Sequence, residues 1–255
     1  MIIRKTEREI ELMRRAGEIA AAARLIAGKL VKVGATTGSI DRNIHDFILS
    51  RGASPSFLHY RGFPASICIS VNEQVIHGIP SSRKLISGDV VSIDIGATKQ
   101  GYIGDCAATF IAGKGSPEAE RLIEVTKECF FEGLKFARVG YRVSSISKAI
   151  QDHAERNGFS VVREYVGHGV GSKLHESPEI PNYIEIPRKK ADPRLMAGLT
   201  LAIEPMVNEG RAAIKILSDN FTVVTADSKN SAHFENTILI TDGEPEILTV
   251  CEGSL

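Results

Sequence analysis

Residues 90–110, VVSIDIGATKQGYIGDCAATF, predict two strands joined by a tight turn. Val91, Ile93 and Ile95 alternate with polar residues, which is the period-two pattern of a strand. Residues 101–110 predict a second strand that runs back along the first. The connection at residues 98–101 is short enough for a hairpin turn.

The predicted hairpin carries an aspartate on each strand. If Lys99 and Gln100 form the loop, Asp94 lies directly opposite Asp105, and directly paired residues have Cβ atoms about 4.5–5.5 Å apart. Two carboxylates at this distance repel each other unless a proton or a cation lies between them. Two interpretations stay open at this point: a metal site, or two solvated aspartates at a sheet edge.

The composition favours a globular protein that does not bind nucleic acid directly. The chain has 255 residues and is 43% hydrophobic, which is enough for the core of one large domain or of two small ones. Lysines and arginines number 31, as do aspartates and glutamates, so the formal net charge is zero. Extended nucleic-acid binding usually shows a basic excess, which is missing here. We interpret the basic clusters at residues 14–15 and 188–190 as solvent-exposed faces.

The cysteines indicate a reducing compartment. Cys68, Cys106, Cys129 and Cys251 are far apart and form no CxxC motif, which favours thiols over a disulfide framework. Cys106 follows Asp105 on a strand, so we expect it to face the core. The charged N-terminus lacks an apolar signal segment, and no apolar run reaches the roughly 18 residues of a membrane span. We therefore expect a soluble, cytoplasmic protein without a membrane partner.

Helix signals precede the strands. Thr6 and Glu9 form a capping box, which predicts a long helix immediately after them. Thr37 or Ser39 would cap a second helix that reaches about residue 50.

Both the helices and the first strand recur later in the chain. Residues 139–158 match residues 33–52 at one constant offset, and residues 195–204 match residues 85–94 at another. A long internal repeat of this kind indicates two copies of one structural unit.

The repeat predicts an α+β fold. Each half, about 6–110 and 116–250, would hold two helices and a strand hairpin, with an insertion near residues 207–230 of the second half. Two such halves pack best about a pseudo-twofold axis, with a central antiparallel sheet and helices outside.

The repeat also brings acids together. Asp94 and Asp105 in one half correspond to Glu204 and Glu235 in the other. Four buried carboxylates need cations to be tolerable. His168 lies in the glycine-rich segment VGHGVG, where the missing side chains let its ring approach a site closely. Oxygen ligands with one imidazole suit divalent Mn, Fe, Co or Zn, and two such ions would acidify a water molecule for attack on a peptide carbonyl.

Two further histidines flank this constellation in sequence. His77 in NEQVIHGIP and His175 in SKLHESPEI could each donate a hydrogen bond to a substrate amide or to a developing oxyanion. On the residues alone, a role as surface or capping histidines is equally open.

The motifs resemble a known family. ICISVNEQVIHGIP, GDVVSIDIGATKQGYIGDCAATF, GHGVGSKLHE and IEPM occur in the order seen in the pita-bread metallopeptidases, and within them the bacterial type I methionine aminopeptidases. The resemblance covers essentially the whole chain. It implies the pita-bread (creatinase/aminopeptidase) fold and a single catalytic domain over residues 1–255. It also implies hydrolytic removal of the initiator methionine from nascent proteins whose second residue is small.

The resemblance further implies a metal centre and a set of substrate contacts. Two divalent ions per chain (Co, Mn, Fe or Zn) would be held by Asp94, Asp105, His168, Glu204 and Glu235, with Glu204 also acting as general base. His77 would contact the scissile amide region and His175 the carbonyl oxygen. The methionine pocket would be lined by His77, Tyr60, Phe63, Cys68 and Phe221.

Two positions depart from the family pattern. Many members carry tryptophan where this chain has Phe221, and many carry an aromatic residue where it has Leu174. Both departures concern the pocket and not the reaction. As partners, the resemblance implies nascent polypeptide N-termini, with the ribosome as one place of contact, and we expect a monomer.

Three alternatives stay open. A proline-specific relative, such as a prolidase or aminopeptidase P, usually has an extra N-terminal domain, whereas the first repeat here begins by residue 6. A non-catalytic binding module on this fold would have lost metal ligands. A creatinase-like hydrolase keeps the fold without the ligand set.

Overall fold

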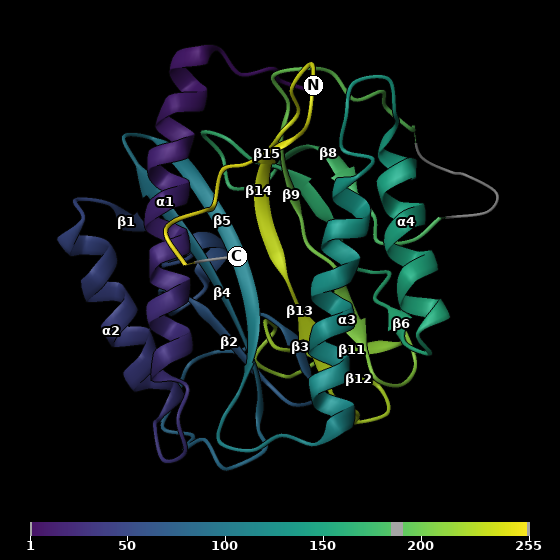
Figure 1. The fold of residues 1–255 in the computed structure, drawn as a ribbon. Helices are drawn as coiled ribbons and strands as arrows, with labels where there is room; N and C mark the ends of the chain where they lie inside the picture. Colours follow the sequence, from purple (N-terminus) through teal and green to yellow (C-terminus); the bar gives the residue numbers. More distant parts are fainter. Residues whose placement is uncertain (1, 185–190, 254–255) are drawn as a thin grey trace.

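The computed structural model describes residues 2–184 and 191–253. Within these ranges, four α-helices form in two pairs, one pair from each half of the chain (Figure 1). The pairs are α1 (Glu7–Leu30) with α2 (Thr37–Ser50), and α3 (Pro117–Leu134) with α4 (Val143–Arg156). The basic cluster at residues 188–190 and the two chain ends lie outside the described residues.

The described residues form one large antiparallel sheet and two small ones. The large sheet runs in the order β1 (Ser54–Pro55), β4 (Val90–Lys99), β5 (Tyr102–Ile111), β14 (Glu235–Leu239), β9 (Thr200–Ile203), β7 (Gly167–Gly169) and β8 (Glu176–Ile180). In addition, β2 (Cys68–Val71) pairs with β4, and β15 (Glu246–Ile247) pairs with β14. In each half two helices precede a run of strands, and strands of both halves form one antiparallel sheet, so the α+β prediction is confirmed.

The segment between β9 and β14, where the insertion was predicted, supplies four of the six strands of the two small sheets. One contains β13 (Ser231–His233), β10 (Met206–Asn208) and β6 (Ser160–Val161). The other contains β11 (Ile214–Ile216), β12 (Val223–Thr225) and β3 (Gln74–Ile76). The counterparts of β4 and β5 in the second half, β9 and β14, pair antiparallel but are not joined by a short turn, because β10 to β13 separate them in the chain.

The N-caps of α1 and α2 test the predicted capping residues. The Thr6 side chain accepts a hydrogen bond from the Glu9 backbone, and the Glu9 carboxylate accepts one from Thr6, so the predicted capping box is present. For α2 the prediction of Thr37 or Ser39 is wrong. Thr36 is the N-cap, and its hydroxyl accepts from the Ser39 amide. Both predicted residues instead lie inside the first turn.

The β4–β5 hairpin is also offset from its predicted register. Lys99 pairs with Tyr102, so the loop residues are Gln100 and Gly101. Both have positive φ, 50° and 84°, which a two-residue type I′ turn requires and which glycine adopts without steric cost. Consequently Asp94 pairs with Ala107, and Asp105 with Gly96. The prediction that the two aspartates lie directly opposite each other is wrong, but both still lie on one face because the shift is even.

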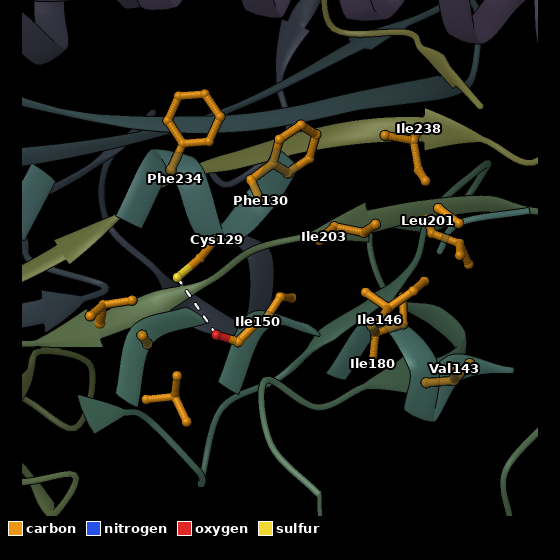
Figure 2. Packing of buried hydrophobic residues seen from close by; sticks show 14 of the residues in the cluster. Cys129, Phe130, Val143, Ile146, Ile150, Ile180, Leu201, Ile203, Phe234 and Ile238 are labelled. Carbon is orange, nitrogen blue, oxygen red and sulfur yellow. Dashed lines mark hydrogen bonds between the residues drawn. The ribbon is translucent and has the colours of Figure 1, made fainter. Parts of the chain in front are cut away.

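The other face of each central strand packs against helices. In the first half, Val91, Ile93 and Ile95 of β4 share a buried cluster with alanines of α1 and isoleucines of α2. Cys106 lies in this cluster, as predicted. In the second half, Ile146 of α4 and Leu201 of β9 belong to a corresponding cluster, shown in Figure 2.

The close contact between α1 and β5 depends on two glycines. A Cβ added at Gly104 would lie 2.5 Å from the Gly17 backbone, and one added at Gly17 would lie closer still to the Leu248 carbonyl oxygen, so neither position accommodates a side chain. None of the helices in residues 2–184 and 191–253 combines the length and apolar character needed to cross a membrane.

Candidate metal centre and substrate cavity

The strand registers bring the predicted ligands together on the face opposite the helices. Ala107 of β5 pairs with Asp94 on one side and with Glu235 on the other, so these two acids flank one small side chain. On the other edge of β14, Glu204 directly follows β9, which pairs with β14. His168 on β7 pairs with Ala202 of β9.

The side-chain distances define two overlapping groups that could hold metal ions. Asp94, His233 and Glu235 form one group, and Asp105, His168 and Glu235 the other, with the potential ligand atoms of each group within 4.8 Å of one another. His168 Nε2 lies 3.4 Å from Glu204 Oε1 and 4.0 Å from Asp105 Oδ2. All five predicted ligands therefore converge on one centre.

These carboxylates lack the partners that buried charges need. Among the described residues, Asp94 Oδ1, Asp105 Oδ1 and Glu235 Oε1 are buried without a hydrogen-bond partner. A buried polar atom left unpaired costs about 1–3 kcal/mol, and more if it is charged. Divalent cations would satisfy these oxygen atoms and offset their mutual repulsion, so the donor set fits a metal centre.

The same environment shifts the pKa values of the acids. Burial raises the pKa of Asp94 to about 7. Burial first, and then neighbouring acids, raise the pKa values of Asp105, Glu204 and Glu235 well above the ordinary range. Without cations, these groups therefore retain protons that a solvated carboxyl would release.

The His168 ring has the tautomer and the neutral charge that a metal ligand needs. Its Nδ1 lies 2.9 Å from the Gly169 carbonyl oxygen, which can only accept, so Nδ1 carries the hydrogen and Nε2 presents a lone pair. Burial lowers the pKa of His168 to about 3, which keeps the ring neutral. A Cβ at Gly167 would lie 2.5 Å from the Ala202 oxygen, and this shows why the neighbouring position has no side chain.

The backbone around the ligands is held by side chains from other elements. The Arg24 guanidinium of α1 is 2% exposed and donates to the Glu235 carbonyl oxygen and to Asn236 Oδ1. The Thr237 hydroxyl accepts from the Asp105 amide and donates to the Asp105 carbonyl. These contacts fix the directions in which Asp105 and Glu235 point.

A cavity of about 570 Å³ opens over this centre. Its walls include every residue that the sequence analysis assigned to the site: Tyr60, Phe63, Cys68, His77, Asp94, Asp105, His168, His175, Glu204, Phe221 and Glu235.

Apolar side chains occupy one end of this cavity. Phe63 and Phe221 meet edge to face, with ring centroids 5.5 Å apart. Cys68 pairs with Asp94 across β2 and β4, so the apolar end adjoins the acids directly. Leu174 is buried in the same cluster. This end suits an unbranched apolar side chain next to the metal centre.

His77 and His175 lie beside the centre. His77 follows β3 with a positive φ of 57°, and its ring contacts Tyr165 edge to face. The Tyr60 hydroxyl lies 2.9 Å from His175 Nδ1, and the His175 ring centroid is 4.3 Å from that of His168. Burial lowers the pKa of His77 to about 4 and, with Arg61, lowers that of His175. Both rings are therefore neutral hydrogen-bonding groups near neutral pH.

Sequence reasoning missed two residues here. Tyr165 contacts His77 and lines the cavity, but no motif singled it out. His233 lies close to Glu204 and Glu235. The signal that could have found it is its position two residues before Glu235, in HFENT.

Comparison with known proteins places these features in a family. Residues 11–242 match metallopeptidase family M24. The chain is 53% identical to the methionine aminopeptidase of Clostridium perfringens over 250 residues, which are 98% of this chain and 99% of that protein. The crystal structure of methionine aminopeptidase from Thermotoga maritima is 42% identical and has a TM-score of 0.93, with 98% of this chain and 99% of that chain covered.

A more distant structure shares only the fold. Prolidase from Pyrococcus furiosus is 23% identical, with a TM-score of 0.80, and the match covers 98% of this chain and 66% of that one. Together, these structures confirm the pita-bread fold.

Proposed function

Since this chain belongs to metallopeptidase family M24, we propose that it releases the N-terminal methionine of nascent polypeptides by hydrolysis, using two divalent metal ions. The convergence of four carboxylates and His168 in one cavity, with three carboxylate oxygens left unpartnered among the described residues, is the observation that carries the proposal. Relatives that match almost end to end bear the name methionine aminopeptidase.

The two ions would be held by Asp94, Asp105, His168, Glu204 and Glu235. Co, Mn, Fe and Zn all suit this mixture of oxygen ligands and imidazole. When bound, such ions lower the pKa of water and polarise the peptide carbonyl. The number two is supported by two overlapping groups of potential ligands that share Glu235.

Glu204 is the proposed general base. Burial and the neighbouring aspartates favour its protonated form, so it is suited to accept a proton from the attacking water. The same carboxyl can then pass that proton to the leaving amine, which restores the carboxylate. Its position directly after β9, beside His168, keeps it within the centre throughout.

The two neutral histidines would orient the substrate. When the Tyr60 hydroxyl donates to Nδ1 of His175, Nε2 of His175 carries the hydrogen and can donate to the carbonyl oxygen of the scissile bond. His77, which also lines the cavity, would contact the scissile amide region. The methionine side chain would occupy the apolar end near Phe63, Cys68 and Phe221.

The proposal includes the setting of the reaction. Residues 1–255 act as a single catalytic domain whose two repeats share one site. The enzyme works as a monomer in the cytoplasm on emerging or released N-termini, including those at the ribosome, and its substrates have a small second residue. Buried thiols at Cys68, Cys106 and Cys129 suit a reducing compartment.

A substrate panel tests the proposal against its rivals. Metal-stripped protein would be given Met-Ala-Ser, Ala-Pro or creatine, with and without each of the four metals. We expect methionine release from Met-Ala-Ser only with metal, and little turnover of the other two compounds. Comparable hydrolysis of Ala-Pro would favour a proline-specific enzyme, and turnover of creatine without metal would favour a creatinase-like hydrolase. Inactivity on all three compounds would indicate a binding module.

A further inference from the structure

We propose that His233 is a sixth protein ligand of the metal centre and binds a divalent ion through Nε2. The inference rests on the proposed function only in assuming that the centre holds metal. His233 lies at the end of β13 and is 2% exposed. Its Nε2 is buried and has no hydrogen-bond partner among the described residues.

The surroundings of His233 Nε2 fit coordination better than a hydrogen bond. The atom lies 3.7 Å from Glu235 Oε2 and 3.8 Å from Glu204 Oε2, and both distances exceed those of N–H···O hydrogen bonds. Two atoms that each lie about 2.0–2.2 Å from one ion are at most about 4.4 Å apart. The observed separations therefore leave room for an ion shared by the imidazole and a carboxylate.

The backbone of His233 is held in place before any ion binds. The His233 amide donates to the Thr109 hydroxyl, and that hydroxyl donates to the His233 carbonyl oxygen, each at 2.9 Å. Thr109 also contacts Ser92 Oγ at 2.8 Å, which ties β13 to both strands of the hairpin. In addition, His233 pairs with Met206 of β10. Because the side chain is also buried, the imidazole has little conformational freedom to lose when it binds an ion.

The two groups of potential ligands support the same conclusion. Asp94 and His233 share Glu235 with Asp105 and His168. Each group thus contains one aspartate and one imidazole, and Glu235 belongs to both. If His168 were the only histidine ligand, the group that contains Asp94 would have no nitrogen ligand.

X-ray absorption at the cobalt edge gives a direct test. Tag-free protein would be loaded with two Co²⁺ per chain. The number of imidazole ligands would then be determined from the outer-shell scattering of their rings. We expect two imidazoles for two cobalt ions in the wild type, and one in His233→Gln and His233→Asn. His153→Gln is a matched control because His153 pairs with Glu128 at the surface, so its count should equal the wild-type value.

The wild-type count decides the proposal even if both variants fold poorly. One imidazole per two cobalt ions would overturn it, and so would an unchanged count in a folded His233→Gln protein. Calorimetric titration should also show affinity for one of the two ions falling by at least about 10-fold in His233→Gln. These readouts do not require turnover. Failure of methionine release from Met-Ala-Ser would therefore count against the proposed function and not against this ligand.

Discussion

The Nε2 atom of His168 lies 3.4 Å from the Oε1 atom of Glu204, although the two residues belong to different strand segments of the second repeat. The contact arises because β7 pairs with β9 at Ala202, two residues before Glu204. It links a neutral ring to the acid that is best placed to move a proton. The proposed acid–base and metal-binding roles thus meet at one pair of side chains.

Replacing Glu204 with glutamine should lower kcat by about 10²-fold or more, with a smaller change in KM. Glutamine keeps the size of the side chain but cannot accept the proton, and a general acid–base group contributes about 10²–10⁴-fold. Steady-state kinetics on Met-Ala-Ser, with bound metal quantified in the same samples, would check this. Glu124→Gln on the exposed face of α3 should leave kcat unchanged. A change in KM alone for Glu204→Gln would place the base elsewhere.

Substitutions of His175 and Tyr60 should have non-additive effects on kcat/KM. His175→Ala should lower kcat/KM by an amount equivalent to about 2.7–4 kcal/mol if it removes a donor to the oxyanion. Tyr60→Phe removes the hydroxyl that contacts Nδ1, which should cost about 0.5–1.5 kcal/mol. In a double-mutant cycle, Tyr60→Phe should have little further effect once His175 is alanine. An equal effect of Tyr60→Phe in both backgrounds would show that Tyr60 acts independently of the histidine.

The sequence predicted the site better than it predicted the local geometry. Asp94 and Asp105 were recognised as a pair because strand periodicity places them on one face, and an even error in register does not change that face. The register itself depended on the turn. Gly101 rather than Lys99 occupies one of the two positions with positive φ. Likewise, Thr36, Thr37 and Ser39 are all capable caps, and only the path of the chain before α2 selects Thr36.

The second residue of the substrate should determine the rate. We expect kcat/KM for Met-Ile-Ser to be at least about 10²-fold lower than for Met-Ala-Ser, because a misplacement of about 1 Å can cost this much. The physical reason is the His77–Tyr165 pair, whose rings meet edge to face in the cavity wall and would crowd a branched side chain there. Competition between the two peptides, followed by mass spectrometry, measures the ratio directly. Equal rates would exclude a steric limit at this position.

The stability of the metal-free protein should fall between pH 7 and pH 8. The pKa of Asp94 is raised to about 7, and those of Asp105, Glu204 and Glu235 are raised well above their usual range. The folded state therefore binds more protons than the unfolded state, and stability decreases as pH rises through the folded-state pKa values. His77, His168 and His233 have lowered pKa values and act in the opposite direction, but mainly below their unfolded pKa of about 6.5.

Thermal unfolding in the presence of a chelator would check this pH dependence. The melting temperature of the wild type should drop across the interval, and that of Asp105→Asn should drop less. With saturating divalent ion the decline should disappear, because metal binding favours the deprotonated carboxylates. A melting temperature that rises with pH in the metal-free wild type would show that the acids are not protonated in the folded state.

His233 shows what sequence patterns could not supply. Its strand, β13, is separate from β14, with Phe234 between them, so alternation along a single strand does not place His233 relative to Glu235. The contacts of its backbone with Thr109 of the hairpin and with Met206 of β10 bring His233 close to Glu204 and Glu235. Tyr165 was missed for a related reason, since it lies in a loop and reaches the site through its contact with His77.

The number of metal ions bound per chain, measured together with methionine release, tests the central claim most directly. Metal-stripped protein would be titrated with Mn²⁺ or Co²⁺, dialysed and analysed by mass spectrometry of the metal, while the same samples are assayed on Met-Ala-Ser. We predict no release without metal, activity that follows metal content, and saturation at two ions per chain. Asp105→Asn and His168→Ala should bind less metal and lose nearly all turnover. Full methionine release from wild-type protein that contains no detectable metal would contradict the account.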